Sequence, residues 1–317
     1  LYDLTDIIKD DISLNSNNDN NNDSKTNDNI PIVLTHGYAS AGGMYIHTIQ
    51  SLYKTLNDKR DIHVIDWLGN GCSSRPEFLC KNVDESETFF IDSLNEWRKK
   101  MNINKMILLG HSLGGYLSCC YAMKYPQYVD HLILVSPVGI PKRPDNSERP
   151  NTSWKIKLLF NTFEHLWNRG WTPHDAIKLI PNSKKVIHNI IDKRLFRLPS
   201  SNEEKNGDIL DKNAQINNDN IDEEILKKNK KFKVLLGEYL YHVICQKGSS
   251  EYALNRILLP GAWAVKPLCS RLHELKKYQD INGLKIDFIY GETDWMSSEH
   301  AMKLKDDNKI DCNVYVV

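Results

Sequence analysis

The chain has 317 residues with 41 basic (Lys, Arg) and 41 acidic (Asp, Glu) side chains, so its formal net charge is zero. This balance gives no support to nucleic-acid binding, which needs a basic face. No run of roughly 18 apolar residues is present that could span a membrane. The seven cysteines lack metal-ligand spacing and indicate free thiols in an intracellular protein without structural zinc.

The first segment of the chain, residues 1–29, is rich in Asn, Asp, Ser and Lys, above all from residue 15 onwards. Such a composition cannot bury enough apolar surface to offset the entropy lost on ordering. We therefore predict a disordered Asn-rich segment over 1–29. The chain begins with Leu rather than Met, so a targeting segment before it would be out of view.

A buried strand is predicted at Ile30–Thr35, and it leads into the turn His36-Gly37-Tyr38. A His-Gly turn after an early strand is where one group of parallel-sheet enzymes places a donor for an oxyanion. The backbone N–H of Tyr38 is the candidate donor, and a plain glycine turn is the alternative.

A further strand is predicted at Asp61–Asp66, followed by a glycine-containing loop over 67–76. Phosphate binding would require the glycines to open directly into a helix, but Arg75-Pro76 intervene, so a nucleotide site is disfavoured. An amphipathic helix is predicted over Glu85–Met101, because its apolar residues recur at helical spacing.

The most informative stretch is 106–115, Met-Ile-Leu-Leu-Gly-His-Ser-Leu-Gly-Gly. Its apolar start predicts a buried parallel strand, and a helix of small residues is predicted from Leu117. Between them the elbow residues Gly110, His111 and Gly114 flank Ser112 in a G-x-S-x-G pattern, in which a strained turn presents the serine hydroxyl. Ser112 is the candidate nucleophile, and the N–H of Leu113 is the candidate partner of Tyr38 in the oxyanion hole.

The next strand is predicted at His131–Ser136, and the alternation of strands and helices predicts a doubly wound, mostly parallel sheet. Residues 141–275 interrupt this alternation and are predicted to form an inserted helical cap, with a disordered insertion at 200–233. An apolar stripe runs through the cap segment 156–167. It is typical of a helix face packed on a core, although a wall of an acyl channel or contact with a lipid surface remains open.

The sheet is predicted to resume with Ile286–Tyr290 and to end with Cys312–Val317. Asp294 follows the first of these strands, which is the position of the acid in the chain order Ser, Asp, His. The strand that ends at Ser136 is followed by Pro137 and offers no acid. Asp294 is therefore the candidate that orients the catalytic histidine.

These motifs resemble the α/β-hydrolase-domain proteins of the four/five subfamily. The resemblance extends over residues 30–317 apart from the Asn-rich insertions, and it is carried by these segments: 66–76, 96–98, 105–115, 131–136, Trp171-Thr-Pro, 239–242, 249–251, 261–263 and 266–267. The segment Tyr290–Met296 is closer to the cardiolipin-specific deacylases of the same branch. Some members of the subfamily carry Asn at the nucleophile position and act as co-activators of a lipid-droplet lipase, whereas this chain has Ser112.

The resemblance implies an α/β-hydrolase fold and a catalytic histidine with a His-x4-Asp motif after the last strand, a few residues beyond Val317. We therefore expect the chain to be truncated and inactive for lack of the base. The expected domains are a first core part at 30–140, the cap at 141–275 and a second core part at 276–317.

The predicted function is a serine hydrolase that cleaves acyl groups from phospholipids, lysophospholipids or N-acyl phospholipids through an acyl-enzyme at Ser112. No cofactor or metal is required, and no nucleic-acid partner is expected. The protein is expected in the cytoplasm or at the periphery of a membrane or lipid droplet, where it meets its lipid acyl-ester substrate. A lysophospholipid acyltransferase and a non-catalytic lipase co-activator are the alternatives.

Overall fold

The computed structural model describes residues 30–56, 60–144, 154–195, 219–246 and 248–317. They form two compact units: one joins the described residues up to Thr172 to those from 248 onwards, and the other is Pro173–Gln246. The segment 1–29 and residues 200–218 of the insertion, both predicted to be disordered, lie outside the described residues. The boundaries of core and cap given above stay predictions.

The first unit contains a six-stranded sheet whose neighbouring strands all run parallel. In spatial order the strands are β2 (Ile62–Ile65), β1 (Ile32–Thr35), β3 (Met106–His111), β4 (Val129–Val135), β7 (Lys285–Tyr290) and β8 (Asn313–Val316). Every residue of β1 and all but the last of β3 are buried, as expected for strands covered on both faces. The predicted doubly wound parallel sheet is confirmed.

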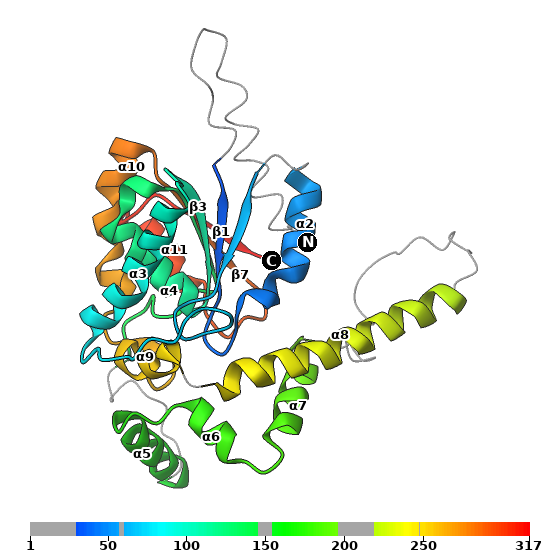
Figure 1. The fold of residues 1–317 in the computed structure, drawn as a ribbon. Coiled ribbons are helices and arrows are strands. Elements are labelled where there is room, and N and C mark those ends of the chain that lie inside the picture. Colours follow the sequence, from blue (N-terminus) through cyan, green and yellow to red (C-terminus); the bar gives the residue numbers. More distant parts are fainter. Residues whose placement is uncertain (1–29, 57–59, 145–153, 196–218, 247) are drawn as a thin grey trace, which may run out of the picture. The chain divides into compact units, whose positions relative to one another are not determined.

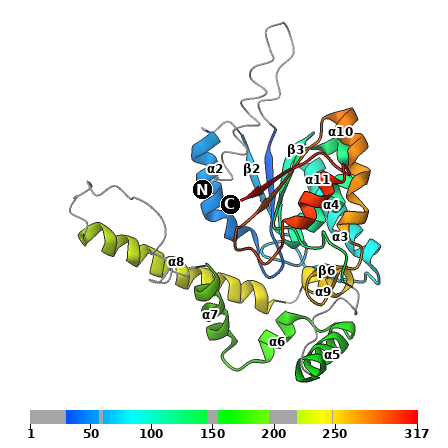
Figure 2. The same cartoon turned by 180° about the vertical axis from the view of Figure 1, so that it is seen from behind.

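Helices cover both faces of this sheet (Figures 1 and 2). One face carries α2 (Ile46–Leu56), and the other carries α3 (Val83–Lys100), α4 (Leu113–Lys124), α10 (Lys276–Asn282) and α11 (Glu299–Asp306). Alternate side chains of each strand serve the two layers: Leu34 packs in the cluster that contains Leu52 of α2, whereas Val33 belongs to the cluster of α3 and α4. The period-two alternation of a strand thus builds two cores.

Helix α4 begins at Leu113, directly after Ser112 and earlier than the predicted start at Leu117. Its residues from Leu113 to Ala122 are all buried, so no amphipathic period marks its start in the sequence. A Cβ atom on Gly114 would lie 2.5 Å from the carbonyl oxygens of Thr35 and His36. The glycine therefore lets the first turn of α4 press against the end of β1.

The remainder of the first unit contains α5 (Trp154–Asn168), α9 (Ser249–Ile257) and a small antiparallel pair, β5 (Leu258–Leu259) with β6 (Trp263–Ala264). Short 3-10 helices occupy Gly42–Tyr45, Pro126–Tyr128, Leu268–Ser270 and Leu272–Leu275. The sequence indicated only helices around β5 and β6, because strands of two residues carry no readable period.

The apolar stripe of α5 does not have a single environment. Trp167 is buried, and its indole N–H donates to the carbonyl oxygen of Leu258 at 3.0 Å. Phe160 is 61% exposed. The prediction that the stripe packs on a core is therefore wrong at this residue. The side chains of Ile156 and Leu159 lie outside the described part of the structure.

The second unit contains α6 (Pro173–Leu179), α7 (Ser183–Leu195) and α8 (Asp219–Cys245). Buried apolar side chains of α7 and α8 form its interior: Ile187, Ile191, Leu236 and Leu240. Helix α8 begins inside the segment 200–233, where the structure differs from the prediction of disorder. Lys and Glu are good helix formers, so a polar composition does not prevent a helix. No helix in the described ranges is long and apolar enough to cross a membrane.

Candidate active site

Three candidate side chains follow neighbouring strands at the carboxyl edge of the sheet. Ser112 follows β3, Ser136 follows β4, and Asp294 lies in the loop after β7. The Ser112 N–H donates to the Val135 carbonyl at 3.0 Å, and the Ser136 N–H donates to the Ile289 carbonyl at 2.8 Å. The parallel ladder therefore continues beyond the strands and places these residues next to one another, in the region where doubly wound sheets bind ligands.

Ser112 has a strained backbone conformation, with φ of 55° and ψ of −117°. A residue other than glycine held there costs roughly 1–3 kcal/mol, a strain that is concentrated at functional sites. The neighbouring glycines are required by contact, because a Cβ atom on Gly110 would lie 2.6 Å from the carbonyl oxygen of Gly114. Ser112 is partly exposed between a buried strand and a buried helix, as the G-x-S-x-G pattern predicts.

The His36-Gly37 turn lies against this elbow. A Cβ atom on Gly37 would be 2.9 Å from the Cβ of Ser112 and 3.2 Å from Nδ1 of His111, so only glycine allows this approach. Tyr38, the next residue, is brought to the same place. Leu113 is the first residue of α4, and N–H groups in the first turn of a helix have no acceptor within it. The structure thus gathers Tyr38, Leu113 and Ser112, while their roles in catalysis stay predictions.

The carboxylate of Asp294 is held by two donors. Its Oδ2 accepts a hydrogen bond from the Ser136 hydroxyl, and its Oδ1 accepts one from the backbone N–H of Met296 at 3.0 Å. Ser136 itself has a positive φ of 45°. No acid follows β4, and the contact of Ser136 with the acid that follows the next strand was not predicted from the sequence. A polar residue at the end of a buried strand is the signal that could have indicated this contact.

His111 lies close enough to Asp294 for their charges to interact. The protein atoms around its ring lower the pKa of His111, although part of the residue is open to solvent, and the charge of Asp294 partly opposes this shift. The imidazole is therefore expected to be neutral near pH 7. This keeps a positive charge away from the elbow.

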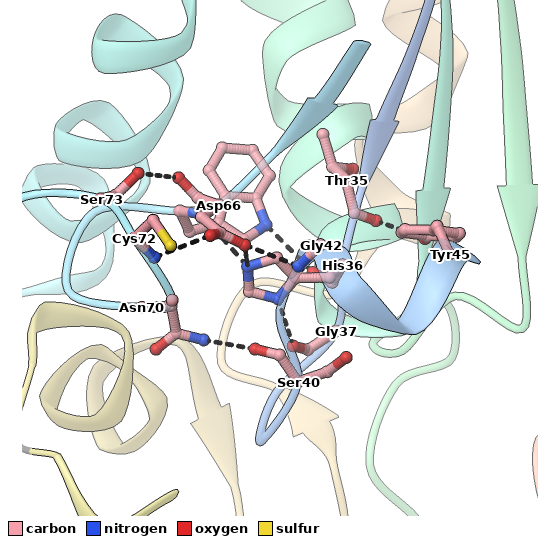
Figure 3. Close-up of polar contacts among 12 residues, drawn as sticks. Thr35, His36, Gly37, Ser40, Gly42, Tyr45, Asp66, Asn70, Cys72 and Ser73 are labelled. Carbon is pink, nitrogen blue, oxygen red and sulfur yellow. Dashed lines mark hydrogen bonds and ion pairs between the residues drawn. The ribbon is translucent and has the colours of Figure 1, made fainter. Parts of the chain in front are cut away.

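A polar cluster connects the His36-Gly37 turn to the loop after β2 (Figure 3). It contains His36, the first residue of that turn, and Asp66, for which no role was predicted. His36 is 1% exposed, and the Asp66 carboxylate accepts hydrogen bonds from the backbone N–H groups of Gly42 and Cys72. Both residues directly follow strands, which is the sequence signal that points to the carboxyl edge.

Within the described ranges, no group of three or more His, Cys, Asp or Glu side chains is arranged to hold a metal ion. All seven cysteines are free thiols. Burial raises the pKa of the Cys119 thiol and of the Cys120 thiol in α4, so neither is an activated nucleophile.

A parallel sheet with helices on both faces, a strained serine turn after β3 and an acid after β7 are together typical of hydrolases that use a serine nucleophile. A family model described as alpha/beta hydrolase fold matches residues 30–317. The chain belongs to the alpha/beta hydrolase fold family.

Its relatives include proteins that are named for lipid acyl chemistry. The chain is 31% identical over 284 residues to a rice (Oryza sativa subsp. japonica) protein named probable 1-acylglycerol-3-phosphate O-acyltransferase, covering 89% of this chain and 60% of the relative. It is 31% identical over 288 residues to human (lyso)-N-acylphosphatidylethanolamine lipase, covering 88% of this chain and 69% of the relative. The chain thus spans 60% of the length of the rice relative.

A solved esterase from Exiguobacterium antarcticum is similar in fold, with a TM-score of 0.52 at 16% identity over 90% of this chain and 82% of the esterase. At this identity the likeness shows the fold alone. The nearer resemblance to cardiolipin-specific deacylases stays a prediction.

Proposed function

We propose that this chain carries the core of a serine hydrolase that removes acyl groups from phospholipids, lysophospholipids or N-acyl phospholipids. The observation that supports this most is the strained turn at Ser112, which has both the first turn of α4 and the His36-Gly37 turn against it. Such an arrangement presents a hydroxyl beside backbone N–H groups, as acyl transfer to serine requires. The lipid substrate class is proposed from the names of the relatives.

In the proposed reaction the Ser112 hydroxyl oxygen attacks the acyl carbonyl carbon, and the carbonyl oxygen becomes an oxyanion. The backbone N–H groups of Leu113 and Tyr38 donate to that oxygen. A histidine takes the serine proton and passes it to the leaving alcohol or amine. Water then attacks the acyl-enzyme and releases the fatty acid, which restores the serine.

Asp294 orients the histidine in this proposal. Each of its oxygens already accepts one hydrogen bond and retains a further lone pair for an imidazole N–H. The start of the Asp294 loop is bonded to the end of β8, which runs parallel to β7. The Glu292 N–H donates to the Val317 carbonyl at 2.7 Å.

The proposed function is tested with the protein expressed from its complete reading frame and a fluorophosphonate probe. We expect labelling of the wild type at Ser112 and release of fatty acid from a lysophospholipid. Ser112→Ala and Asp294→Asn should each lose about a thousandfold or more of the hydrolytic rate. Ser51→Ala replaces an exposed serine of α2 and is the matched control that retains labelling.

The acyltransferase alternative is favoured by the name of the rice relative. It would use the same acyl-enzyme, or the His-x4-Asp motif that the resemblance implies, and pass the acyl group to a lysophospholipid instead of water. Supplying a lysophospholipid with an acyl donor separates the two: accumulation of free fatty acid supports the hydrolase, and accumulation of diacyl product supports the transferase. A folded wild type that binds lipid vesicles, is not labelled at Ser112 and forms neither product would overturn both and favour the co-activator.

A further inference from the structure

The imidazole of His36 is buried between the His36-Gly37 turn and the loop after β2 (Figure 3). Its Nε2 is 3.2 Å from the backbone nitrogen of Trp67, and its Nδ1 is 2.8 Å from the carbonyl oxygen of Gly37. A backbone N–H can only donate, so Nε2 must accept and carry no hydrogen. The hydrogen-bond network therefore assigns the neutral tautomer in which Nδ1–H donates to the Gly37 oxygen.

The Gly37 carbonyl that accepts this hydrogen bond belongs to the same peptide group as the candidate oxyanion donor, the Tyr38 N–H. The Gly37 carbonyl and the Tyr38 N–H are the two ends of one planar peptide, and the described residues contain no cis peptide bond. In a trans peptide the N–H points away from the C=O. A donor that holds the carbonyl oxygen thereby sets the direction of the N–H, and it also polarises the amide so that its N–H becomes a stronger donor.

We propose that His36 is a positioning residue of the oxyanion hole, which holds the Gly37–Tyr38 peptide so that the Tyr38 N–H points at the developing oxyanion beside Ser112. This role rests on the proposed function. The contact of Gly37 with the elbow supports it, since a Cβ on Gly37 would lie only 2.9 Å from the Cβ of Ser112.

Asp66 holds the same turn from its other end. Its Oδ1 accepts the Gly42 N–H at 2.6 Å, and its Oδ2 accepts the Cys72 N–H at 2.8 Å. One carboxylate thus connects the end of the oxyanion turn to the loop after β2. That loop closes tightly around it, because a Cβ on Gly71, whose φ is 47°, would lie 2.1 Å from Oδ2. The indole N–H of Trp67 adds a further connection to the His36 carbonyl at 3.0 Å.

The protonation state of His36 agrees with this geometry. Burial lowers the pKa of His36 and the nearby His111 adds to this shift, while the hydrogen bond with the Gly37 carbonyl and the charge of Asp66, 3.8 Å from Nε2, oppose it. A proton on Nε2 would face the Trp67 N–H and break the bond that sets the ring orientation. The neutral imidazole is the state that keeps both hydrogen bonds, to the Gly37 oxygen and from the Trp67 N–H.

The test compares His36→Leu, which removes the donor, with His36→Asn, whose side-chain amide can still reach the Gly37 oxygen. His131→Asn is the matched control: His131 is a second buried histidine, in β4 and bonded to Asp287 rather than to the oxyanion turn. For each variant we would measure kcat and KM on a short acyl ester, the Kd of an acyl trifluoromethyl ketone, and stability to urea. The ketone forms a tetrahedral oxyanion adduct with serine, so its affinity reports on the oxyanion hole.

Removing one oxyanion donor costs about 100-fold to 1000-fold in kcat, and misdirecting it should cost less. We expect His36→Leu to lower kcat and ketone affinity by the same factor, about 10-fold to 100-fold, with little change in KM. His36→Asn should recover part of both. His131→Asn should lower stability with little change in kcat or ketone affinity. If His36→Leu does not fold, His36→Asn is compared with wild type by the same measurements, and its ketone affinity should fall while its KM changes little.

A folded His36→Leu whose kcat and ketone affinity stay within about twofold of wild type would overturn the positioning role while the proposed function stands. Loss of kcat without loss of ketone affinity would also overturn it. A wild type that is neither labelled at Ser112 nor active would remove the proposed function and this role together.

Discussion

Two pairs of histidine and aspartate lie within or directly beyond the strands of the same sheet and differ in what they bind. The side chains of His131 in β4 and Asp287 in β7 meet across neighbouring strands, offset by two positions in register, with Nε2 and Oδ2 2.8 Å apart. His36 and Asp66 each stand one residue beyond a strand, and their closest side-chain atoms are 3.8 Å apart. His131 and Asp287 bond directly to each other and are called the inner pair below. His36 and Asp66, the outer pair, bond instead to backbone groups of loops.

The position along the strand explains the difference. Inside the sheet the backbone groups already bond to neighbouring strands, so the side chains of His131 and Asp287 satisfy each other, and Asn313 of β8 adds a hydrogen bond to Asp287 at 2.9 Å. In the turns that follow β1 and β2, the ladder no longer satisfies the backbone groups. His36 and Asp66 bond to those groups instead, so the same residue types connect strands in one place and shape a candidate site in the other.

The largest effect is expected from breaking the inner pair. His131→Leu leaves the Asp287 carboxylate buried without its main partner, which should lower the free energy of unfolding by about 3 kcal/mol. The kcat of the protein that remains folded should change little, because the pair lies away from Ser112. Urea denaturation and kinetics on a short acyl ester measure the two quantities.

The double variant His131→Leu/Asp287→Leu sharpens this result. Replacing both partners by apolar side chains should restore part of the lost stability, because no charge is then left buried alone. A single variant that loses less than about 1 kcal/mol would show that the inner pair does not connect the strands as described.

In the outer pair, Asp66→Asn should affect catalysis more than stability, the reverse of the result expected for His131→Leu. An amide has a single oxygen to accept, whereas the carboxylate has two, so the NH2 group of the introduced Asn would face either the Gly42 or the Cys72 N–H. We expect kcat/KM to fall about 10-fold, corresponding to about 1.4 kcal/mol, with a smaller loss of stability than for His131→Leu. Asp61→Asn, an exposed carboxylate before the same strand, is the control. Equal losses in stability and unchanged kcat/KM would contradict a site-shaping role.

A smaller effect on the free energy of unfolding is expected when the pH is lowered. The pKa of His36 is lower in the folded protein than the unfolded value of about 6.5. Above about pH 6.5 neither state is protonated and stability is complete; below it the unfolded state binds the proton first, so stability falls as the pH decreases. His36→Asn should make this part of the decline shallower. His111 and His174 have lowered pKa values too and add declines of the same sign, so the difference between the variant and wild type is the quantity to measure by urea denaturation across this range.

The smallest effect is expected from a third pair, which lies near the surface beside His131. Lys105 and Asp130 are 3.5 Å apart and remain partly exposed. Lys105→Ala should change the free energy of unfolding by at most about 0.5 kcal/mol, because water screens the interaction. A loss as large as that of His131→Leu would mean that charge pairing, rather than burial, determines the contribution of these pairs.

Local sequence patterns predicted much of the frame. The six strands and the elbow at Ser112 were readable because short apolar runs and the G-x-S-x-G spacing reflect interactions within a few residues. The pair β5–β6 and the early start of α8 were not, since two-residue strands have no period and polar helices lack an apolar stripe. The contact of Ser136 with Asp294 joins residues 158 positions apart in the sequence and depends on the strand order.

By itself the sequence determined the strand segments, the serine at a tight turn and an acid after a late strand, because backbone preferences and burial act over short stretches of chain. Only the tertiary structure decided which strand ends lie side by side. It thereby decided that His36 bonds to the peptide beside Ser112, and that Asp66 connects two loops from neighbouring strands. These hydrogen bonds form between groups that approach one another only after the sheet has assembled, so no local pattern in the chain records them.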